Sequence, residues 1–249
     1  MGTLDGRVAI VTGAARGVGR GIALALATEG ARVAVADVLP ADDVLADVAS
    51  AGGEAWAATC DIRVSAEVDA FVAAVVERWG GVDVLVNNAI ATAIGPLQDL
   101  SDDDLMLGFA TGPLASAYFM RACHPHLRDC AGGGRVVNLR SGTEQNGMPG
   151  YTAYVAAKAA VGGLTRAAAR EWGRDGITVN AVVPFALSEG TLSALDEQQV
   201  AGVLRQLSVR RSGDPEADIG RAVVYLVGPD ASYVTGATLM LDGGGAFFS

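Results

Sequence analysis

Short apolar segments alternate with longer amphipathic segments from one end of the chain to the other. The apolar segments have the length of buried strands, and in each segment between them the apolar residues recur with helical spacing. The predicted strands are 7–12, 32–37, 54–60, 83–87, 135–139, 178–183 and 238–241, and the predicted helices are 18–29, 41–51, 65–79, 101–127, 152–174, 193–206 and 215–227.

This alternation of strands and helices predicts an α/β fold with a doubly wound, seven-stranded parallel sheet. Helices on both faces and right-handed crossovers would give three α/β/α layers. No linker, repeat or low-complexity segment interrupts residues 1–249, so we expect a single domain. The irregular stretch 184–192 follows a strand, where such sheets bind ligands, and we expect a substrate loop or lid at about 185–210.

Composition and charge exclude several classes of function. The chain has 249 residues, of which 51% are hydrophobic, and a net charge of -10, which disfavours nucleic acid and anionic membrane as partners. No uncharged apolar run reaches about 18 residues and no export signal is visible, so we expect a cytoplasmic protein. Cys60, Cys123 and Cys130 lack metal-ligand spacing, so we expect interior thiols and no metal site.

A glycine-rich turn, Thr-Gly-Ala-Ala-Arg-Gly-Val-Gly at 12–19, joins the first predicted strand to the first helix. Glycines allow a close approach of the backbone to a pyrophosphate, and the helix N-terminus offers free N–H groups. Such turns are common, but this position between strand and helix predicts a dinucleotide site. The predicted cofactor-binding residues of the turn are Gly13, Arg16, Gly17, Val18 and Gly19.

Asp37 ends the second predicted strand, about 20 residues after the turn. A carboxylate here can accept hydrogen bonds from both ribose hydroxyls and repels a 2′-phosphate, which favours NAD over NADP. A solvated loop acid or a helix cap is the alternative. Arg16 favours NADP instead, because a cation in the turn could bind a 2′-phosphate.

Tyr154 and Lys158 are four residues apart in a predicted helix and therefore share a face. We expect the ammonium to lower the pKa of the phenol, which would make Tyr154 an acid and base near neutral pH. Such pairs are common on helix surfaces, but Lys158 is the only lysine of the chain. Ser141 follows the strand 135–139, at the edge where it could polarise a substrate carbonyl.

With these motifs in place, the chain resembles the short-chain dehydrogenase/reductase family from about residue 4 to residue 245. Asp61-Ile62, Asn87-Asn88-Ala89 and the spacing of Ser141 before Tyr154 match the family's order, as do 179–184 (VNAVVP), 234–236 (VTG) and 242–244 (DGG). The resemblance implies a Rossmann-like sheet, a nicotinamide cofactor, catalysis by Ser141, Tyr154 and Lys158, and a homotetramer. It further implies cofactor contacts at Asp61, Ile62, Asn88, Ala89, Tyr154, Lys158, Pro184, Phe185 and Leu187.

The chain departs from the family pattern at several positions around the nicotinamide and substrate. Ile90 replaces a glycine, and Gly112 stands where the family has an asparagine that supports a water-mediated proton relay, with Thr111 beside it as a weak substitute. We expect the helix to kink or open at Gly112 and its backbone to hold the water. Phe185 replaces a second glycine of the family pattern. Glu189, which follows Ser188, replaces a threonine. These changes indicate a reshaped pocket rather than lost cofactor binding.

Three functions compete on this evidence. The leading one is an NAD(H)-dependent oxidoreductase acting on a small ketone or secondary alcohol. An NADPH-dependent 3-oxoacyl-carrier-protein reductase is the alternative. Such enzymes place arginines near the positions that Gly132 and Asp175 occupy in this chain, which argues against this alternative. The third is a cofactor-binding sensor or scaffold with degraded turnover.

The residues expected around the substrate are mainly apolar, which favours an apolar or aryl ketone, although each could simply be packing. The predicted substrate residues are Ile94, Gln145, Met148, Tyr151 and Phe185, with Ile90, Leu187 and Leu192 also bordering the pocket and Glu144 and Glu189 as polar exceptions.

Overall fold

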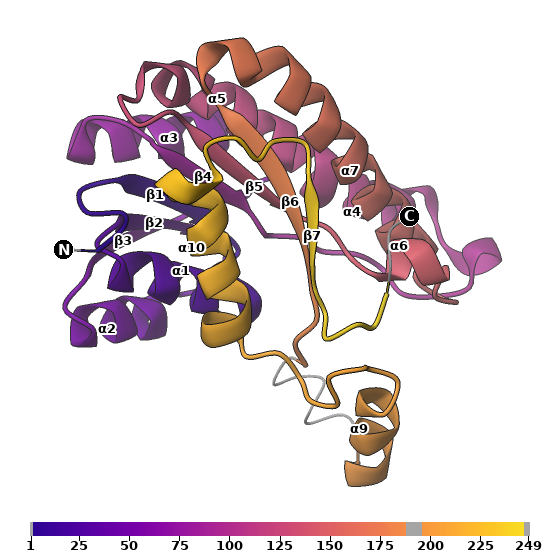
Figure 1. The fold of residues 1–249 in the computed structure, drawn as a ribbon. Coiled ribbons are helices and arrows are strands. Elements are labelled where there is room, and N and C mark those ends of the chain that lie inside the picture. Colours follow the sequence, from indigo (N-terminus) through magenta and orange to yellow (C-terminus); the bar gives the residue numbers. More distant parts are fainter. Residues whose placement is uncertain (1, 188–195, 247–249) are drawn as a thin grey trace.

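The computed structural model describes residues 2–187 and 196–246. Its centre is a seven-stranded sheet with the order β3-β2-β1-β4-β5-β6-β7, in which every neighbouring pair is parallel (Figure 1). The predicted α/β fold with a doubly wound sheet is confirmed. The strands are β1 (Val8–Thr12), β2 (Arg32–Asp37), β3 (Glu54–Thr59), β4 (Val84–Asn87), β5 (Arg135–Leu139), β6 (Thr178–Pro184) and β7 (Thr238–Leu241).

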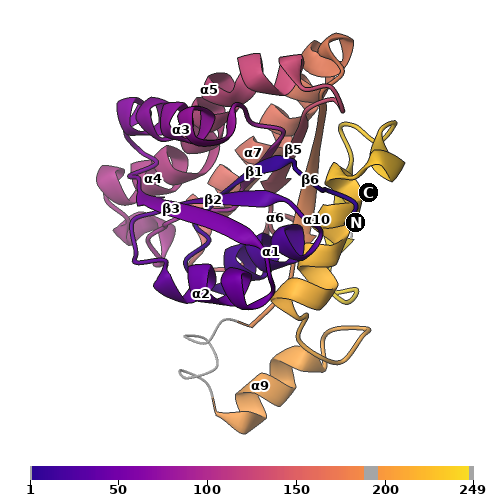
Figure 2. The same ribbon diagram turned by 90° about the vertical axis from the view of Figure 1, so that its left-hand side faces the viewer.

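Helices cover both faces of the sheet and make the expected three layers (Figure 2). One hydrophobic cluster joins the sheet to the first layer through Ile22, Val44 and Val223, and a second joins it to the other layer through Phe71 and Phe119. The first layer contains α1 (Gly17–Thr28), α2 (Asp42–Ser50) and α10 (Arg221–Val227), and the second contains α3 (Ser65–Trp79), α4 (Asp102–Phe109), α5 (Ala115–Asp129) and α7 (Thr152–Trp172).

The strand order reverses between β1 and β4, because β1 pairs with both β2 and β4. Crossovers leave the neighbouring ends of these strands toward opposite faces, which opens a crevice at their carboxyl ends. The turn after β1 and Asn88 after β4 border this crevice. The topology therefore puts the predicted cofactor site where an open α/β sheet binds its ligand.

The predicted helix 101–127 is interrupted. A π-helical turn, Ala110–Leu114, separates α4 from α5 and contains Gly112 and Pro113. Proline lacks an N–H and glycine disfavours regular helix, so both residues promote the wider turn. The expectation that the helix opens at Gly112 is confirmed. A second π-helical turn, Pro215–Gly220, precedes α10.

Shorter elements complete the described structure. The predicted helix 193–206 is α9 (Glu197–Leu204), which projects away from the main body in Figures 1 and 2; residues 193–195 lie outside the described residues. The short helix α6 (Thr143–Asn146) was not predicted, because four residues carry no helical periodicity. None of the helices within 2–187 and 196–246 is both long and apolar enough to cross a membrane.

The three cysteines are free thiols, but only two lie in the interior. Cys60 and Cys123 are buried, whereas Cys130 is partly exposed and donates to the Asp83 carboxylate, with Sγ and Oδ1 2.8 Å apart. The expectation of three interior thiols is therefore wrong for Cys130, which lies in the partly exposed loop after α5 and binds Asp83 there.

Candidate active site

Backbone N–H groups at the start of α1 have no side-chain partner, although the Ala15 N–H in the turn before the helix donates to Asp37. α1 has no side-chain N-cap and no acidic residue in its first turn, in contrast to α4 and α9, which begin with capping boxes. Gly17 opens the helix with φ of 61°, and a Cβ there would meet nothing within 4 Å. Free N–H groups beside open space suit a bound phosphate, so the turn fits the pyrophosphate of a dinucleotide.

Asn88 braces the turn from the neighbouring strand. Its Nδ2 donates to the carbonyl oxygens of Thr12 and Gly13 at 2.9 and 2.8 Å. Thr12 Oγ1 accepts from the backbone N–H groups of Asn88 and Ala89, both at 3.0 Å. A side chain at Gly19 would collide with this brace, since its Cβ would lie 2.6 Å from Asn88 Nδ2. The Asn88 amide therefore shapes the glycine-rich turn, a role that the sequence did not reveal.

Asp37 lies beside the turn, as predicted. Its Oδ2 accepts from the Ala15 N–H at 2.9 Å and its Oδ1 from the Leu39 N–H at 3.0 Å. Each carboxylate oxygen can accept a further hydrogen bond, so both stay available to a diol. Arg16 is exposed at the N-cap of α1. The structure thus puts both of the competing specificity residues at the mouth of the same crevice.

Asp61 and Ile62 are less open to a cofactor than the resemblance implies. Arg63 donates to the Asp61 carboxylate from Nε and Nη2, with Nη2 2.6 Å from Oδ2. This contact lowers the pKa of Asp61. Ile62 is buried in the hydrophobic cluster that contains Phe71 and Phe119. Its side chain is core packing, so Ile62 offers a ligand only its backbone.

Ser141, Tyr154 and Lys158 meet at the carboxyl end of β5. Ser141 follows this strand, and its Oγ lies 2.9 Å from Thr143 Oγ1. Tyr154 is in the first turn of α7, close enough to Ser141 for the serine side chain to affect the pKa of its phenol. Lys158, one turn later, is 4% exposed and donates from Nζ to the Leu139 carbonyl at 2.7 Å. The fold therefore brings together the three residues proposed for catalysis.

The pKa values differ from the sequence expectation. Burial raises the pKa of the Tyr154 phenol; hydrogen bonding with Ser141 opposes the rise, and the charge of Glu144 adds to it. Burial also lowers the pKa of Lys158 to about 8. The expected lowering of the Tyr154 pKa by Lys158 is wrong here, because Lys158 Nζ is bound to Leu139 and lies 5.7 Å from the centre of the Tyr154 ring. The phenol is held in its acid form.

Apolar side chains form the rim near Tyr154. Tyr151 packs edge-on against Tyr154 with ring centres 6.2 Å apart, and Ile94 and Met148 are 63% and 45% exposed. The backbone hydrogen bond from Gly95 N to Gly150 O, 2.9 Å long, ties the loop of Ile94 to the loop of Met148. These contacts place the exposed apolar side chains of Ile94 and Met148 on loops next to Tyr151, and exposed apolar surface of this kind suits the binding of an apolar molecule.

The other predicted rim residues are placed differently. Phe185 and Leu187 are partly buried, and their N–H groups donate to Leu241 O at 3.0 Å and Ser212 Oγ at 2.9 Å. Pro184, which the resemblance assigned to the cofactor, ends β6 beside them. Gln145 is exposed. Ser188, Glu189 and Leu192 lie outside the described residues.

Glu144 is not a polar group of the substrate pocket. Its side chain is 3% exposed and pairs with Arg140, Oε2 lying 2.5 Å from Nη2. The sequence patterns did not point to Arg140, although a charged residue directly after a buried strand is an unusual feature that could have drawn attention to it.

Thr111 does not replace the family's asparagine. Its Oγ1 lies 2.8 Å from the carbonyl oxygens of both Ala91 and Leu107 and accepts from the Ala91 N–H at 3.0 Å. These contacts fasten the loop after β4 to the π-helical turn and occupy the hydroxyl.

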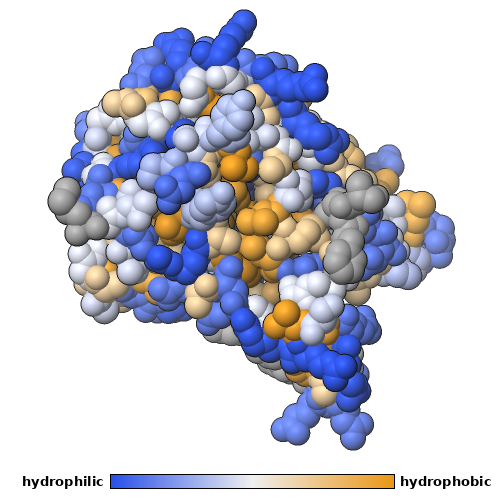
Figure 3. Space-filling model, viewed as in Figure 1, coloured by the Kyte–Doolittle hydropathy of each residue, from blue (hydrophilic) through white to orange (hydrophobic). Residues whose placement is uncertain are grey.

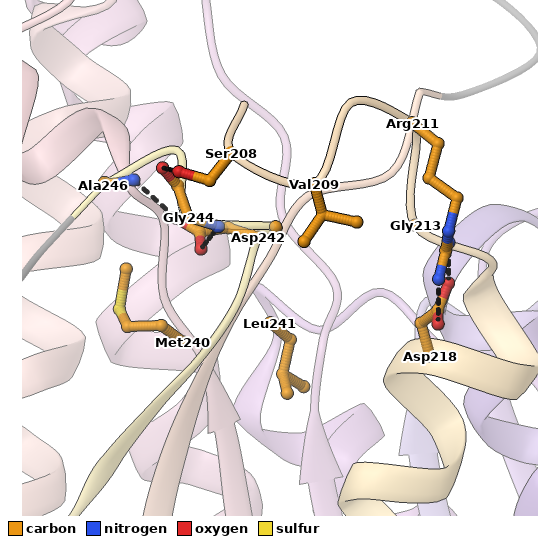
Figure 4. A pocket seen from close by; sticks show the side chains of 11 residues that line it. Ser208, Val209, Arg211, Gly213, Asp218, Met240, Leu241, Asp242, Gly244 and Ala246 are labelled. Carbon is orange, nitrogen blue, oxygen red and sulfur yellow. Dashed lines mark hydrogen bonds and ion pairs between the residues drawn. The ribbon is translucent and has the colours of Figure 1, made fainter. Parts of the chain in front are cut away.

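A pocket of about 450 Å³ lies beside the carboxyl end of β7 (Figure 4). Its walls include Val209, Leu241 and Asp242, and none of Ser141, Tyr154 and Lys158 lines it. It approaches the site through Ala246, whose Cβ would be 3.1 Å from a Cβ on Gly142. The pocket is thus a neighbour of the Ser141 loop and not the place where the three polar side chains meet.

Comparison with known proteins gives consistent matches. The family described as "Enoyl-(Acyl carrier protein) reductase" matches residues 13–246. A 12alpha-hydroxysteroid dehydrogenase from a Clostridium species is 39% identical, with 98% of each chain covered. The 3-oxoacyl-[acyl-carrier-protein] reductase FabG of Staphylococcus aureus is 37% identical, with 95% of this chain and 96% of that protein covered.

A solved structure shares the fold as well as the sequence. It is a 7 alpha-hydroxysteroid dehydrogenase complexed with NADH and 7-oxo glycochenodeoxycholic acid, and it matches with a TM-score of 0.90 at 33% identity. The match covers 98% of this chain and 95% of that chain.

Proposed function

The chain belongs to the short-chain dehydrogenase/reductase family of oxidoreductases, and we propose that it is an NAD(H)-dependent enzyme for an apolar or aryl ketone and the matching secondary alcohol. The observation that carries the proposal is the meeting of Ser141, Tyr154 and Lys158 beside the crevice at the strand-order reversal. The dinucleotide would bind at the turn formed by 12–19, with Asp37 toward its ribose. The nicotinamide would supply or accept the hydride.

The protein's own groups handle the proton of this reaction. In reduction, the Tyr154 phenol donates its proton to the carbonyl oxygen as the hydride reaches the carbonyl carbon, so that one hydride and one proton give the alcohol. In oxidation, Tyr154 takes the hydroxyl proton. A phenol is protonated at neutral pH, so Tyr154 carries the proton that the donor role requires, although its raised pKa makes it a weaker acid.

Ser141 and Lys158 support Tyr154 in different ways. The Ser141 hydroxyl can donate to the same carbonyl oxygen and thereby stabilise the negative charge that develops there. The Lys158 ammonium, one helical turn beyond Tyr154, can donate a hydrogen bond to the ribose of the cofactor.

The apolar rim supports the substrate class. Tyr151 packs on the Tyr154 ring, Ile94 and Met148 are exposed on the neighbouring loops, and a small polar substrate would leave their apolar surface in water. Two of the similar proteins described above are hydroxysteroid dehydrogenases by name, and a steroid is a largely apolar ring system. A steroid ketone or an aryl ketone therefore suits this site better than a sugar.

One observation favours a second candidate, an NADPH-dependent 3-oxoacyl-carrier-protein reductase. Arg16 is exposed at the N-cap of α1, where it could meet a 2′-phosphate. The acidic Asp175, which pairs with His124 at 3.2 Å, makes that region a poor match for an acidic carrier protein.

A substrate panel decides between the two candidates. Oxidation of NADH and NADPH is followed with a keto-steroid, an aryl ketone, a keto-sugar and a 3-oxoacyl thioester. We expect turnover of the first two with NADH. Turnover of the thioester alone, with NADPH, would establish the second candidate, and no turnover of any substrate would refute the proposal.

A further inference from the structure

Arg140 and Glu144 form a buried ion pair next to Ser141. Arg140 follows β5 directly and Glu144 lies in α6. The guanidinium binds the carboxylate with two prongs, Nη2 to Oε2 at 2.5 Å and Nε to Oε1 at 3.3 Å. The two side chains are 9% and 3% exposed. Removing two charges from water is costly even when they pair, so a buried pair at this place calls for a role other than stability.

The carboxylate holds the backbone of Ser141. Glu144 Oε1 accepts from the Ser141 N–H at 3.1 Å, and the Glu144 N–H donates back to the Ser141 carbonyl at 3.3 Å. The two contacts close a small loop that carries the Ser141 hydroxyl. The direction of this hydroxyl therefore depends on the position of Glu144.

The guanidinium connects this loop to the sheet and to α7. Arg140 Nη1 donates to Thr238 Oγ1 of β7 at 2.8 Å, and the Arg140 N–H donates to Val182 O of β6 at 2.9 Å. On α7 it lies against Gly162, where a Cβ would be only 2.6 Å from Cζ. Gly162 is one turn beyond Lys158, so Arg140 packs on the helix that carries the acid and its ammonium.

Glu144 also acts on both ionisable groups of the site through its charge. It raises the pKa of Tyr154 and the pKa of Lys158. The other ionisable groups facing Tyr154 in the described residues are Tyr151, which precedes α7, Lys158 on α7, and Arg140 behind Glu144. A negative charge near Tyr154 disfavours the phenolate, so Glu144 affects how tightly the phenol holds its proton.

We propose that Arg140 and Glu144 are a positioning pair for the reaction: Arg140 fixes Glu144 between β7 and α7, and Glu144 orients Ser141 and places its negative charge near Tyr154. The inference rests on the proposed function of the same site. Neither residue touches the reacting atoms; both act through Ser141, Tyr154 and Lys158.

The first test is Glu144→Gln, which keeps an oxygen for the Ser141 N–H but removes the charge. The ultraviolet titration of the Tyr154 phenol, taken as the difference from the same protein with Tyr154→Phe, needs no substrate. We expect its midpoint to fall by about one pH unit. An unchanged midpoint would overturn the proposal, and because no turnover is involved this result is independent of the proposed function.

The kinetic readout of the same variant separates positioning from general damage. We expect kcat for ketone reduction to fall by about tenfold and its pH profile to move toward acid, while KM for NADH stays within about twofold. Should Glu144→Gln fail to fold, the double variant Arg140→Gln with Glu144→Gln removes both charges, and the same loss of kcat is expected. A folded double variant with wild-type kcat would contradict the inference.

Adjacent glycines on α7 offer a matched pair of variants. Gly162→Ala places a methyl group 2.6 Å from the Arg140 Cζ, whereas Gly163→Ala meets nothing within 4 Å. Both changes raise helix propensity equally. We expect Gly162→Ala to lower kcat by about tenfold and to shift the Tyr154 midpoint, and Gly163→Ala to leave both unchanged. Equal behaviour of the two variants would show that the position of Arg140 does not matter.

Discussion

Ile90 lies directly beside Gly112, since a Cβ built on Gly112 would be 3.4 Å from Ile90 Cδ1 and 3.4 Å from Ala157 Cβ. These two residues are separate departures from the family pattern in the sequence, yet they are neighbours in the fold. Ile90 borders the space that an asparagine side chain at position 112 would enter. The two changes therefore form one local rearrangement beside the helix of Lys158.

The first prediction concerns Gly112→Asn. The π-helical turn opens the backbone here, and free carbonyls of such a turn can hold a water without an asparagine. We expect kcat of this variant to change by less than about tenfold across the pH range. A rise well above tenfold, greatest at low pH in the oxidation direction, would show that the native proton path is broken. The double variant Gly112→Asn with Ile90→Gly removes any steric clash between the asparagine and the Ile90 side chain. A change in kcat that persists in the double variant therefore comes from the asparagine itself.

Tyr154→Phe keeps the ring and its contact with Tyr151 but removes the proton donor. We expect kcat to fall by at least about 100-fold, while NADH binding measured by fluorescence titration is largely retained. Tyr151→Phe is the matched control, because its ring packs on Tyr154 without a proposed proton role. A Tyr154→Phe enzyme with near wild-type activity would rule out the mechanism.

Asp37 is expected to set the preference for NADH. Leaving a carboxylate unpaired beside a buried phosphate costs on the order of 1–3 kcal/mol, which corresponds to roughly 10–100-fold in kcat/KM. Asp37→Asn should narrow the ratio of kcat/KM for NADH to that for NADPH, since the amide keeps an acceptor for Ala15 or Leu39 without the charge. A preference of the wild-type enzyme for NADPH would mean that Arg16, and not Asp37, determines the cofactor specificity.

Lys158→Met should cost activity but gain stability at neutral pH. The pKa of Lys158 is about 8 in the folded protein, against an ordinary lysine value of 10.5, so below pH 8 the fold carries a buried charge. Between pH 8 and 10.5 the unfolded state binds more protons, so wild-type stability rises relative to the variant. Urea unfolding should show the variant more stable by about 1–3 kcal/mol at pH 7, with the gap narrowing at about pH 10. A constant gap would contradict the lowered pKa.

Assembly is the last prediction. Apolar side chains gather on the face formed by β7 and α10 (Figure 3), where Leu239 and Tyr225 are 38% and 47% exposed. On the other layer Met106 and Leu114 are exposed as well. Such surface is costly to leave in water, and we expect a homotetramer by light scattering at micromolar concentration. Leu239→Lys should weaken it and Val64→Lys, at the start of α3, should not; a wild-type monomer would refute the prediction.

By itself, the sequence determined the fold class, the order of the elements and the site of the helix opening. Each of these depends on local properties: the period of apolar positions, the turn-forming glycines, and the weak helix propensity of Gly112 and Pro113. The sequence also determined that the residues after the strands lie along one edge of the sheet, because parallel strands have their carboxyl ends on the same edge. The placement of Ser141, Tyr154 and Lys158 near the turn of residues 12–19 therefore follows from the order of the strands and helices alone.

Only the tertiary structure decided how these residues are supported. The Asn88 brace on Thr12 and Gly13 spans 75 residues or more, and the contact of Arg140 with Thr238 spans 98. The direction of the Tyr154 pKa shift likewise depends on burial and on Glu144 rather than on the spacing to Lys158. Such contacts arise from the packing of distant segments at distances of a few ångströms, and local sequence patterns carry no information about that packing.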